Sequence, residues 1–203
     1  MSRAAAAERT TSETTIRATV ELDGRGRATI DTDVGFLDHL LELFARHSLI
    51  DLELTARGDV HVDAHHTAED CGLVLGRALD DALGERAGIR RFGDVRLPMD
   101  EALAECAIDL SGRPYADISP RPAAVDGGDP WLELLPHMLE ALSREARLTV
   151  HLEVHKARSV HHHCEAMMKA FARALRAAIE LDPRLAGNDD ESAVVPSSKG
   201  TLA

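Results

Sequence analysis

A short motif of histidines followed by a glutamate occurs twice in the chain. It reads HHTAE at residues 65–69 and HHHCE at residues 161–165. A histidine and a glutamate four residues apart lie on one face of a helix, with about 5–6 Å between their Cβ atoms. That spacing suits chelation of one divalent cation, as in other helical sites that combine imidazole and carboxylate. Two copies therefore predict two metal sites.

A further histidine lies upstream of each copy, within an apolar helical pattern. These are His39, in GFLDHLLELF, and His137, in LELLPHMLEA. Adjacent histidines on a helix point about 100° apart, so both members of a pair cannot easily join the glutamate on one ion. We expect one member to share an ion with the glutamate, its neighbour to serve the other ion, and His39 and His137 to complete four protein ligands per ion. The eight candidate ligands are His39, His65, His66, Glu69, His137, His161, His162 and Glu165.

In this division, His65 and Glu69 bind one ion together, and His161 and Glu165 form the equivalent pair in the second copy. The residue types leave open whether the two copies meet within one chain or across a subunit contact. Mixed imidazole and carboxylate ligation suits Mn, Fe, Ni, Co or Zn. Four protein ligands leave open positions on octahedral Mn²⁺, whereas tetrahedral zinc would be filled and structural. One motif alone could be a surface histidine pair, but the duplicated set favours metal binding.

The two motifs belong to a longer internal repeat. Residues 20–30 (VELDGRGRATI) resemble residues 107–118 (AIDLSGRPYADI), and Glu13 falls opposite Glu101. Each half predicts two strands joined by a glycine-containing turn, then a helix, a strand and a second helix. The predicted helices are residues 35–47, 68–83, 132–145 and 164–181, and the later strands are residues 50–56 and 148–154.

This order of elements predicts an α+β fold of two similar halves from an internal duplication, each with a β-sheet backed by two helices. We expect a single domain in which the pseudo-repeats cover residues 9–93 and 94–183. The C-terminal segment, residues 184–203, is rich in Gly, Asn, Asp and Ser and predicts a surface loop. Such a tail could be disordered, or its Ser197 and Lys199 could bind a phosphate through a hydroxyl and a point charge.

The composition narrows the possible partners and compartments. A formal net charge of −12 over 203 residues argues against nucleic acid or an anionic membrane as the main partner. The chain contains no run of about 18 apolar residues, so we expect no membrane span. Its first residues lack the apolar core of a signal peptide. Three cysteines without paired spacing, Cys71, Cys106 and Cys164, indicate reduced thiols in a cytoplasmic protein.

The chain resembles the imidazoleglycerol-phosphate dehydratase family of histidine biosynthesis in six ordered segments: GFLDHLLELFARHS, DVHVDAHHTAEDCGLVLGRAL, RRFGDVRLPMDEAL, DLSGRPY, HHHCEAMMKAFARALR and PSSKGTL. The resemblance covers nearly the whole chain. It implies a duplicated α+β fold and dehydration of D-erythro-imidazole glycerol phosphate to imidazole acetol phosphate. It also implies two Mn²⁺ per active site and a 24-subunit homo-oligomer in which the metals help to join subunits.

The same resemblance implies roles for individual residues. The metal ligands are the eight already given, and the substrate-binding residues are Glu13, Arg91, Arg113, Lys169, Ser197 and Lys199. Within this set Arg91, Arg113, Ser197 and Lys199 match the family's phosphate-binding residues. The chain departs from the family before the second histidine pair, where residues 157–159 (ARS) replace the usual Gly-x-Asn stretch.

The reaction needs a proton to leave a carbon that no carbonyl activates. Two cations could each bind one nitrogen of the substrate imidazole, favour the imidazolate and help the ring to expel the adjacent hydroxyl through a diazafulvene-like intermediate. Glu13, Glu69 and Glu165 are the candidates for the acid and base roles, with Glu13 and Glu165 favoured. Two alternatives remain: a dimetal hydrolase, which needs a water bridging metals about 3.5–4 Å apart, and a metal-stabilised assembly protein without catalysis.

Overall fold

Two four-stranded sheets of identical strand order form the outer layers of the protein. The computed structural model describes residues 3–118, 128–187 and 192–202. The first sheet has the order β1-β2-β4-β3 and the second the order β5-β6-β8-β7. The last strand of each sheet is parallel to its neighbour, and the others are antiparallel. The predicted α+β fold of two similar halves is therefore confirmed.

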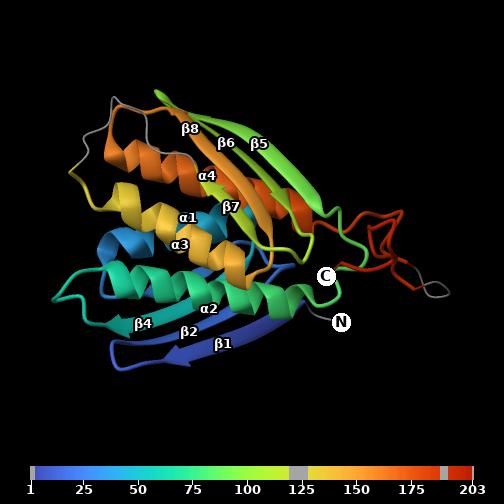
Figure 1. Ribbon diagram of the computed structural model, residues 1–203, viewed down its shortest axis with the longest axis horizontal. Helices are drawn as coiled ribbons and strands as arrows, with labels where there is room; N and C mark the ends of the chain where they lie inside the picture. The colour runs from blue at the N-terminus through green and yellow to red at the C-terminus, as the bar shows by residue number, and fades with distance from the viewer. Residues whose placement is uncertain (1–2, 119–127, 188–191, 203) are drawn as a thin grey trace.

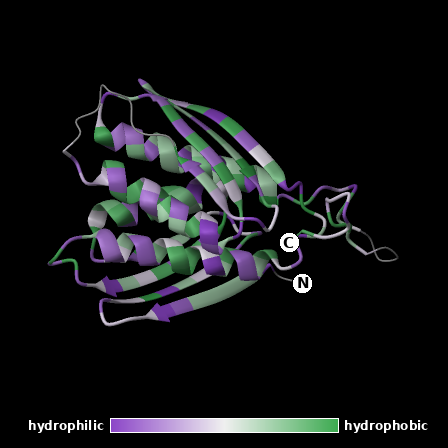
Figure 2. Ribbon diagram, viewed as in Figure 1, coloured by the Kyte–Doolittle hydropathy of each residue, from purple (hydrophilic) through white to green (hydrophobic). Residues whose placement is uncertain are grey.

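The strands are β1 Ala4–Thr10, β2 Thr14–Glu21, β3 Ala28–Asp31, β4 Asp51–Gly58, β5 Phe92–Met99, β6 Ala102–Asp109, β7 Tyr115–Ile118 and β8 Thr149–Lys156. Burial alternates along the central strands, as in β2, where Ile16, Ala18 and Val20 are buried and Thr15 and Arg17 are exposed. Successive side chains of a strand point to opposite faces, and Figure 2 shows the resulting alternation of hydropathy along the strands. One face of each sheet is therefore buried against the helices.

The four helices form a layer between the two sheets (Figure 1). They are α1 Gly35–Ser48, α2 His65–Leu83, α3 Trp131–Glu145 and α4 Val160–Ile179. Helices α1 and α2 pack on the first sheet, and α3 and α4 pack on the second. All four helices begin at the same end of the molecule, on the left in Figure 1. The first turns of all four helices therefore lie at one end of the helix layer.

Each helix of the first half packs lengthwise against one helix of the second half. The pairs are α2 with α3 and α1 with α4. Two glycines allow α2 to approach α3 closely: a Cβ at Gly72 would lie 2.3 Å from the carbonyl oxygen of Met138, and a Cβ at Gly76 would lie 2.4 Å from that of Leu142. Any larger residue would push the two helices apart.

Both motif helices begin earlier than the sequence predicts. Helix α2 begins at His65 instead of residue 68, and α4 begins at Val160 instead of residue 164. At α4 a side-chain cap explains the extension, because the backbone N–H of His162 donates to the N-cap Ser159 at 3.1 Å. At α2 the N-cap is Ala64, and the backbone N–H of His65 donates to Asp63 at 2.8 Å in a local side-chain turn. The histidine pairs therefore lie in the first helical turns.

Other differences from the expected elements lie at the edges. Strands β1 and β5 were not predicted, because AAAA in β1 and the Gly and Pro of β5 are poor strand signals. The described tail, residues 192–202, has no helix or strand, as a surface loop should. All three cysteines are free and buried. None of the helices in the described ranges has the length and apolar character needed to cross a membrane.

Candidate metal centres and substrate site

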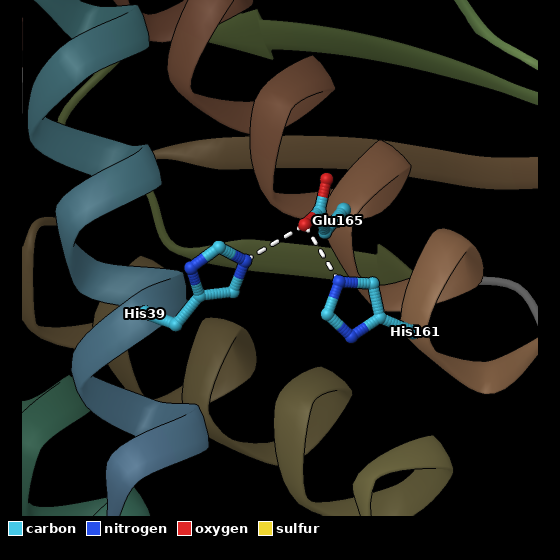
Figure 3. A group of neighbouring side chains, drawn as sticks. All are labelled: His39, His161 and Glu165. Atoms are coloured by element: carbon cyan, nitrogen blue, oxygen red, sulfur yellow. Dashed lines mark hydrogen bonds and ion pairs between the residues drawn. The ribbon is translucent and has the colours of Figure 1, made fainter.

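The first candidate metal centre joins α1 and α4. His39 comes from the second turn of α1, while His161 and Glu165 lie one turn apart on α4. The Nε2 atoms of His39 and His161 lie 2.7 and 2.8 Å from the same carboxylate oxygen, Oε1 of Glu165. Figure 3 shows both imidazoles directed at that oxygen. Three ligand atoms that metals prefer therefore converge on one point.

The second candidate centre joins α2 and α3 in the same way. His65 and Glu69 lie one turn apart on α2, and His137 comes from the second turn of α3. The Nε2 atom of His137 lies 3.5 Å from Oε1 of Glu69, and the rings of His65 and His137 stack at 4.9 Å. In each centre the three ligand atoms lie within 4.8 Å of one another. The spacing suits two imidazoles and a carboxylate around one cation.

The pairing of helices answers the question that the sequence left open. Each centre takes a His–Glu pair from one half and a single histidine from the other half. The halves therefore meet within one chain, and six of the eight expected ligands come together there.

The structure does not bring His66 or His162 to either centre of the described chain. As adjacent residues on a helix, they point away from the ligands beside them. The Nδ1 atom of His66 lies 3.1 Å from Oδ2 of Asp59 and 3.8 Å from Glu13. The Nδ1 atom of His162 lies 2.8 Å from Oε2 of Glu101. Four ligands per ion are thus not assembled from one chain.

A lysine distinguishes the two centres. Lys169, one turn after Glu165 on α4, donates to Oε2 of Glu165, and its Nζ lies 2.9 Å from Sδ of Met99. Burial raises the pKa of Glu165, but hydrogen bonds from Lys169 and His39 lower it to about 2. Glu165 is therefore ionised at neutral pH, as a metal ligand must be. The corresponding position after Glu69 is Leu73.

The expected phosphate-binding residues Arg91 and Ser197 gather at the C-terminal end of α4. Arg91 binds Asp109 through Nε at 2.7 Å, and its Nη1 donates to the carbonyl of Pro196 at 2.8 Å. This bond ties the tail to Arg91 immediately before Ser197. The backbone N–H of Lys199 donates to Oγ of Ser197 at 3.2 Å.

Arg113 follows the same strand as Asp109, in the turn between β6 and β7, and its side chain is exposed. The backbone of this turn is fixed by Ser111, whose Oγ accepts from the Arg113 N–H at 3.3 Å. Hydrogen bonds thus connect Arg91 to the tail segment that contains Ser197 and Lys199. Arg113 lies four residues after Asp109, the ion-pair partner of Arg91.

The first candidate metal centre and the expected phosphate-binding residue Arg91 lie at opposite ends of α4. The backbone N–H of Arg91 donates to the carbonyl of Ala178 at 2.9 Å. Ala178 lies 13 residues after Glu165 on α4, which corresponds to about 20 Å along the helix axis. A small substrate cannot span that distance, so one chain cannot present both parts to the same molecule.

Two carboxylates that contact the histidine pairs were not predicted as site residues. Asp59 lies in the loop before α2, and Glu101 lies 61 residues before its partner His162. The repeat placed Glu101 opposite Glu13 and so offered a signal for it. Asp59 had none, because its contact with His66 depends on how the loop folds.

Comparison with known proteins identifies the family of the chain. The family model for imidazoleglycerol-phosphate dehydratase matches residues 32–175. The chain belongs to the imidazoleglycerol-phosphate dehydratase family. Imidazoleglycerol-phosphate dehydratases of Clavibacter michiganensis subsp. michiganensis and Cereibacter sphaeroides are 48% and 50% identical to it, over 100% and 96% of this chain and 98% and 96% of theirs.

Solved structures of the family share the fold. The enzyme from Pyrococcus furiosus, crystallised with (S)-C348, is 33% identical and superposes with a TM-score of 0.79 over 96% of this chain and 99% of its own. The enzyme from Staphylococcus aureus is 34% identical, with a TM-score of 0.72 over 88% and 99%. The chain is therefore a dehydratase of histidine biosynthesis, a hydro-lyase. Family membership sets aside the hydrolase and the assembly protein without catalysis.

Proposed function

We propose that the chain converts D-erythro-imidazole glycerol phosphate to imidazole acetol phosphate and water, with two Mn²⁺ per active site. The observation that carries this proposal is the pair of matching centres, each with two imidazole nitrogens and one carboxylate oxygen within 4.8 Å. The donor set fits Mn²⁺ because neutral imidazole and carboxylate together suit a borderline-to-hard cation with open positions. When bound, two such cations would act as Lewis acids on the two nitrogens of the substrate imidazole.

A second copy of the chain would complete each centre. His66 and His162 turn away from the centres of their own chain, yet a carboxylate on Nδ1 leaves their Nε2 free to bind a metal. A histidine from a neighbouring copy would supply the fourth protein ligand of each ion. Metal binding would then join subunits.

The phosphate requires a second copy for an independent reason. The roughly 20 Å along α4 between Glu165 and the anchor of Arg91 exceeds the length of the substrate. A neighbouring chain would therefore bring its Arg91, Arg113, Ser197 and Lys199 to the metal-bound imidazole end. Both arguments support a homo-oligomer, and we propose the family's 24-subunit form. The buried free cysteines support a reducing compartment such as the cytoplasm.

Glu13 is the carboxylate that remains for proton transfer. Glu69 and Glu165 belong to the centres, where a metal ligand has no proton to exchange. The side chain of Glu13 is 54% exposed and lies 3.8 Å from His66, beyond hydrogen-bond distance. We therefore assign Glu13 the acid–base role, with Lys169 beside the first centre as a substrate contact.

Turnover of imidazole glycerol phosphate by chelator-stripped protein, with and without added Mn²⁺, tests this proposal. We expect imidazole acetol phosphate to form only when Mn²⁺ is present. Product formation at an equal rate without any metal would contradict the Mn²⁺ proposal. Absence of product in protein that binds two Mn²⁺ per chain would contradict the proposed reaction.

A further inference from the structure

Two carboxylates outside the candidate metal centres contact His66 and His162, the two expected ligands that neither centre includes. Asp59 faces the ring of His66 with both oxygens, at 3.3 and 3.1 Å from Nδ1. Glu101 faces Nδ1 of His162 at 2.8 Å. A carboxylate only accepts hydrogen bonds, so in the neutral form of each ring Nδ1 carries the proton and Nε2 keeps its lone pair.

The two carboxylates occupy different positions in the repeat. Asp59 is the first residue after β4, and the first residue after β8 is Ala157, which is buried and cannot accept a hydrogen bond through its side chain. Glu101 immediately precedes β6, and the residue that immediately precedes β2 is Glu13. The first half therefore fixes its histidine from the end of β4, whereas the second half fixes its histidine from the start of β6, the counterpart of β2.

Because the two halves use different carboxylates, Glu101 is hydrogen-bonded to its histidine, whereas its counterpart Glu13 is not. Glu101 uses both oxygens, since Oε1 also accepts from the backbone N–H of Arg158 at 3.2 Å, and its side chain is only 24% exposed. Glu13 is 54% exposed and makes no side-chain hydrogen bond to His66, which Asp59 already holds. The turn at Thr11 fixes the backbone of Glu13 but not its carboxylate.

We propose that Asp59 and Glu101 are positioning residues that hold His66 and His162 as Nε2 metal ligands, and that Asp59 thereby leaves the Glu13 carboxylate without a hydrogen bond to His66. The assignment rests on the proposed metal-dependent function. Carboxylates that accept from the distal nitrogen of a ligating histidine set its tautomer and ring orientation, and their loss costs about 10–100-fold in metal affinity. Asp59 and Glu101 thus have the same role although their positions do not correspond in the repeat.

The test compares four variants of the full chain for Mn²⁺ affinity, from free Mn²⁺ measured by electron paramagnetic resonance, and for turnover. They are Asp59→Asn, Glu101→Gln, Glu13→Gln and the control Glu105→Gln, which removes a carboxylate 3.3 Å from His155 on the sheet surface. We expect about 10–100-fold weaker Mn²⁺ binding in the first two, with most turnover regained at saturating Mn²⁺. Glu13→Gln should bind Mn²⁺ normally and lose turnover at every Mn²⁺ concentration, and the control should match wild type.

Wild-type Mn²⁺ affinity in both Asp59→Asn and Glu101→Gln would overturn the assignment while leaving the proposed function intact. Weakened binding in Glu13→Gln would also overturn it, because Glu13 would then be the group that holds His66. If Asp59→Asn does not fold, Glu101→Gln decides the question against Glu101→Asp, which keeps the carboxylate and should restore part of the affinity. A wild-type protein that binds no Mn²⁺ would instead overturn the proposed function, and this assignment with it.

Discussion

The two candidate metal centres share their ligand types but differ in their surroundings. The centre on α1 and α4 has Lys169 paired with Glu165, and the Glu165 side chain is 12% exposed. The centre on α2 and α3 has Leu73 at the equivalent position, and the Glu69 side chain is 31% exposed. The helices of the second centre meet through glycines, whereas the interior of α1 and α4 contains none. The two centres therefore have the same types of candidate ligand but differ in the charge beside the glutamate and in the packing of their helices.

Removal of either glutamate ligand should have the largest effect. We expect Glu69→Gln and Glu165→Gln each to reduce bound Mn²⁺ from two per chain to one and to abolish measurable turnover, because each centre loses its only anionic ligand. Glu140→Gln, an exposed position on α3, is the matched control and should leave both unchanged. Metal analysis of the purified protein measures the stoichiometry. Two tightly bound ions in either ligand variant would break the correspondence between the centres.

A substitution at the α2–α3 contact should affect only one centre. Gly72→Ala places a methyl group against the Met138 carbonyl, at a distance of 2.3 Å before any relaxation. Overpacking of this kind costs about 1–3 kcal/mol. We expect a lower melting temperature and weaker Mn²⁺ binding at the His65–Glu69–His137 centre.

The control is Gly35→Ala, since a Cβ at Gly35 meets nothing within 4 Å. Thermal unfolding and Mn²⁺ titration of both variants measure the effects. Equal weakening of the two centres in Gly72→Ala would contradict a local role for the glycine contact.

The lysine should weaken Mn²⁺ binding at its own centre. A charge of +1 about 5 Å from a divalent ion costs on the order of 1–2 kcal/mol in a water-like dielectric, which is roughly tenfold in affinity. Lys169→Met should therefore tighten Mn²⁺ binding at the α1–α4 centre, and Leu73→Lys should weaken it at the α2–α3 centre. Calorimetric titration resolves the two sites. Weaker binding in Lys169→Met would mean that the lysine supports Glu165 as a ligand more than it repels the ion.

The last prediction concerns acid stability of the metal-free protein. Because the pKa of Glu165 is lowered from 4.5 to about 2, its ionised form stabilises the fold above the ordinary value, and this contribution is lost as the pH falls from about 4.5 to about 2. Glu165→Gln should therefore lose less free energy of unfolding over that interval than wild type. Urea unfolding at a series of pH values, with Glu140→Gln as control, measures the difference. Parallel pH profiles would contradict the depressed pKa.

Local periodicity accounts for what could be predicted from the sequence. The spacing of His65 and Glu69 already implied one helical face, and the repeat extended that reasoning to His161 and Glu165. Edge strands such as β1 were not predictable, because its four alanines favour a strand only once β2 is there to pair with it.

Contacts that depend on loop conformation or on distant segments account for what was missed. Asp59 and Glu101 reach their histidines only after loops and strands have folded. The roughly 20 Å along α4 from Glu165 to Ala178 separates Arg91 from the first centre because the backbone of Arg91 binds Ala178, and no local pattern reveals that contact. The sequence therefore predicted a set of candidate ligands but not which of them one chain brings together.

Anomalous diffraction from crystals of the Mn²⁺-loaded protein tests the central claim most directly. The account predicts two manganese peaks per chain, one between His39, His161 and Glu165 and one between His65, Glu69 and His137. Each peak should also lie within bonding distance of His66 or His162 of a neighbouring copy. A single peak per chain, or two peaks whose protein ligands all come from one chain, would contradict it.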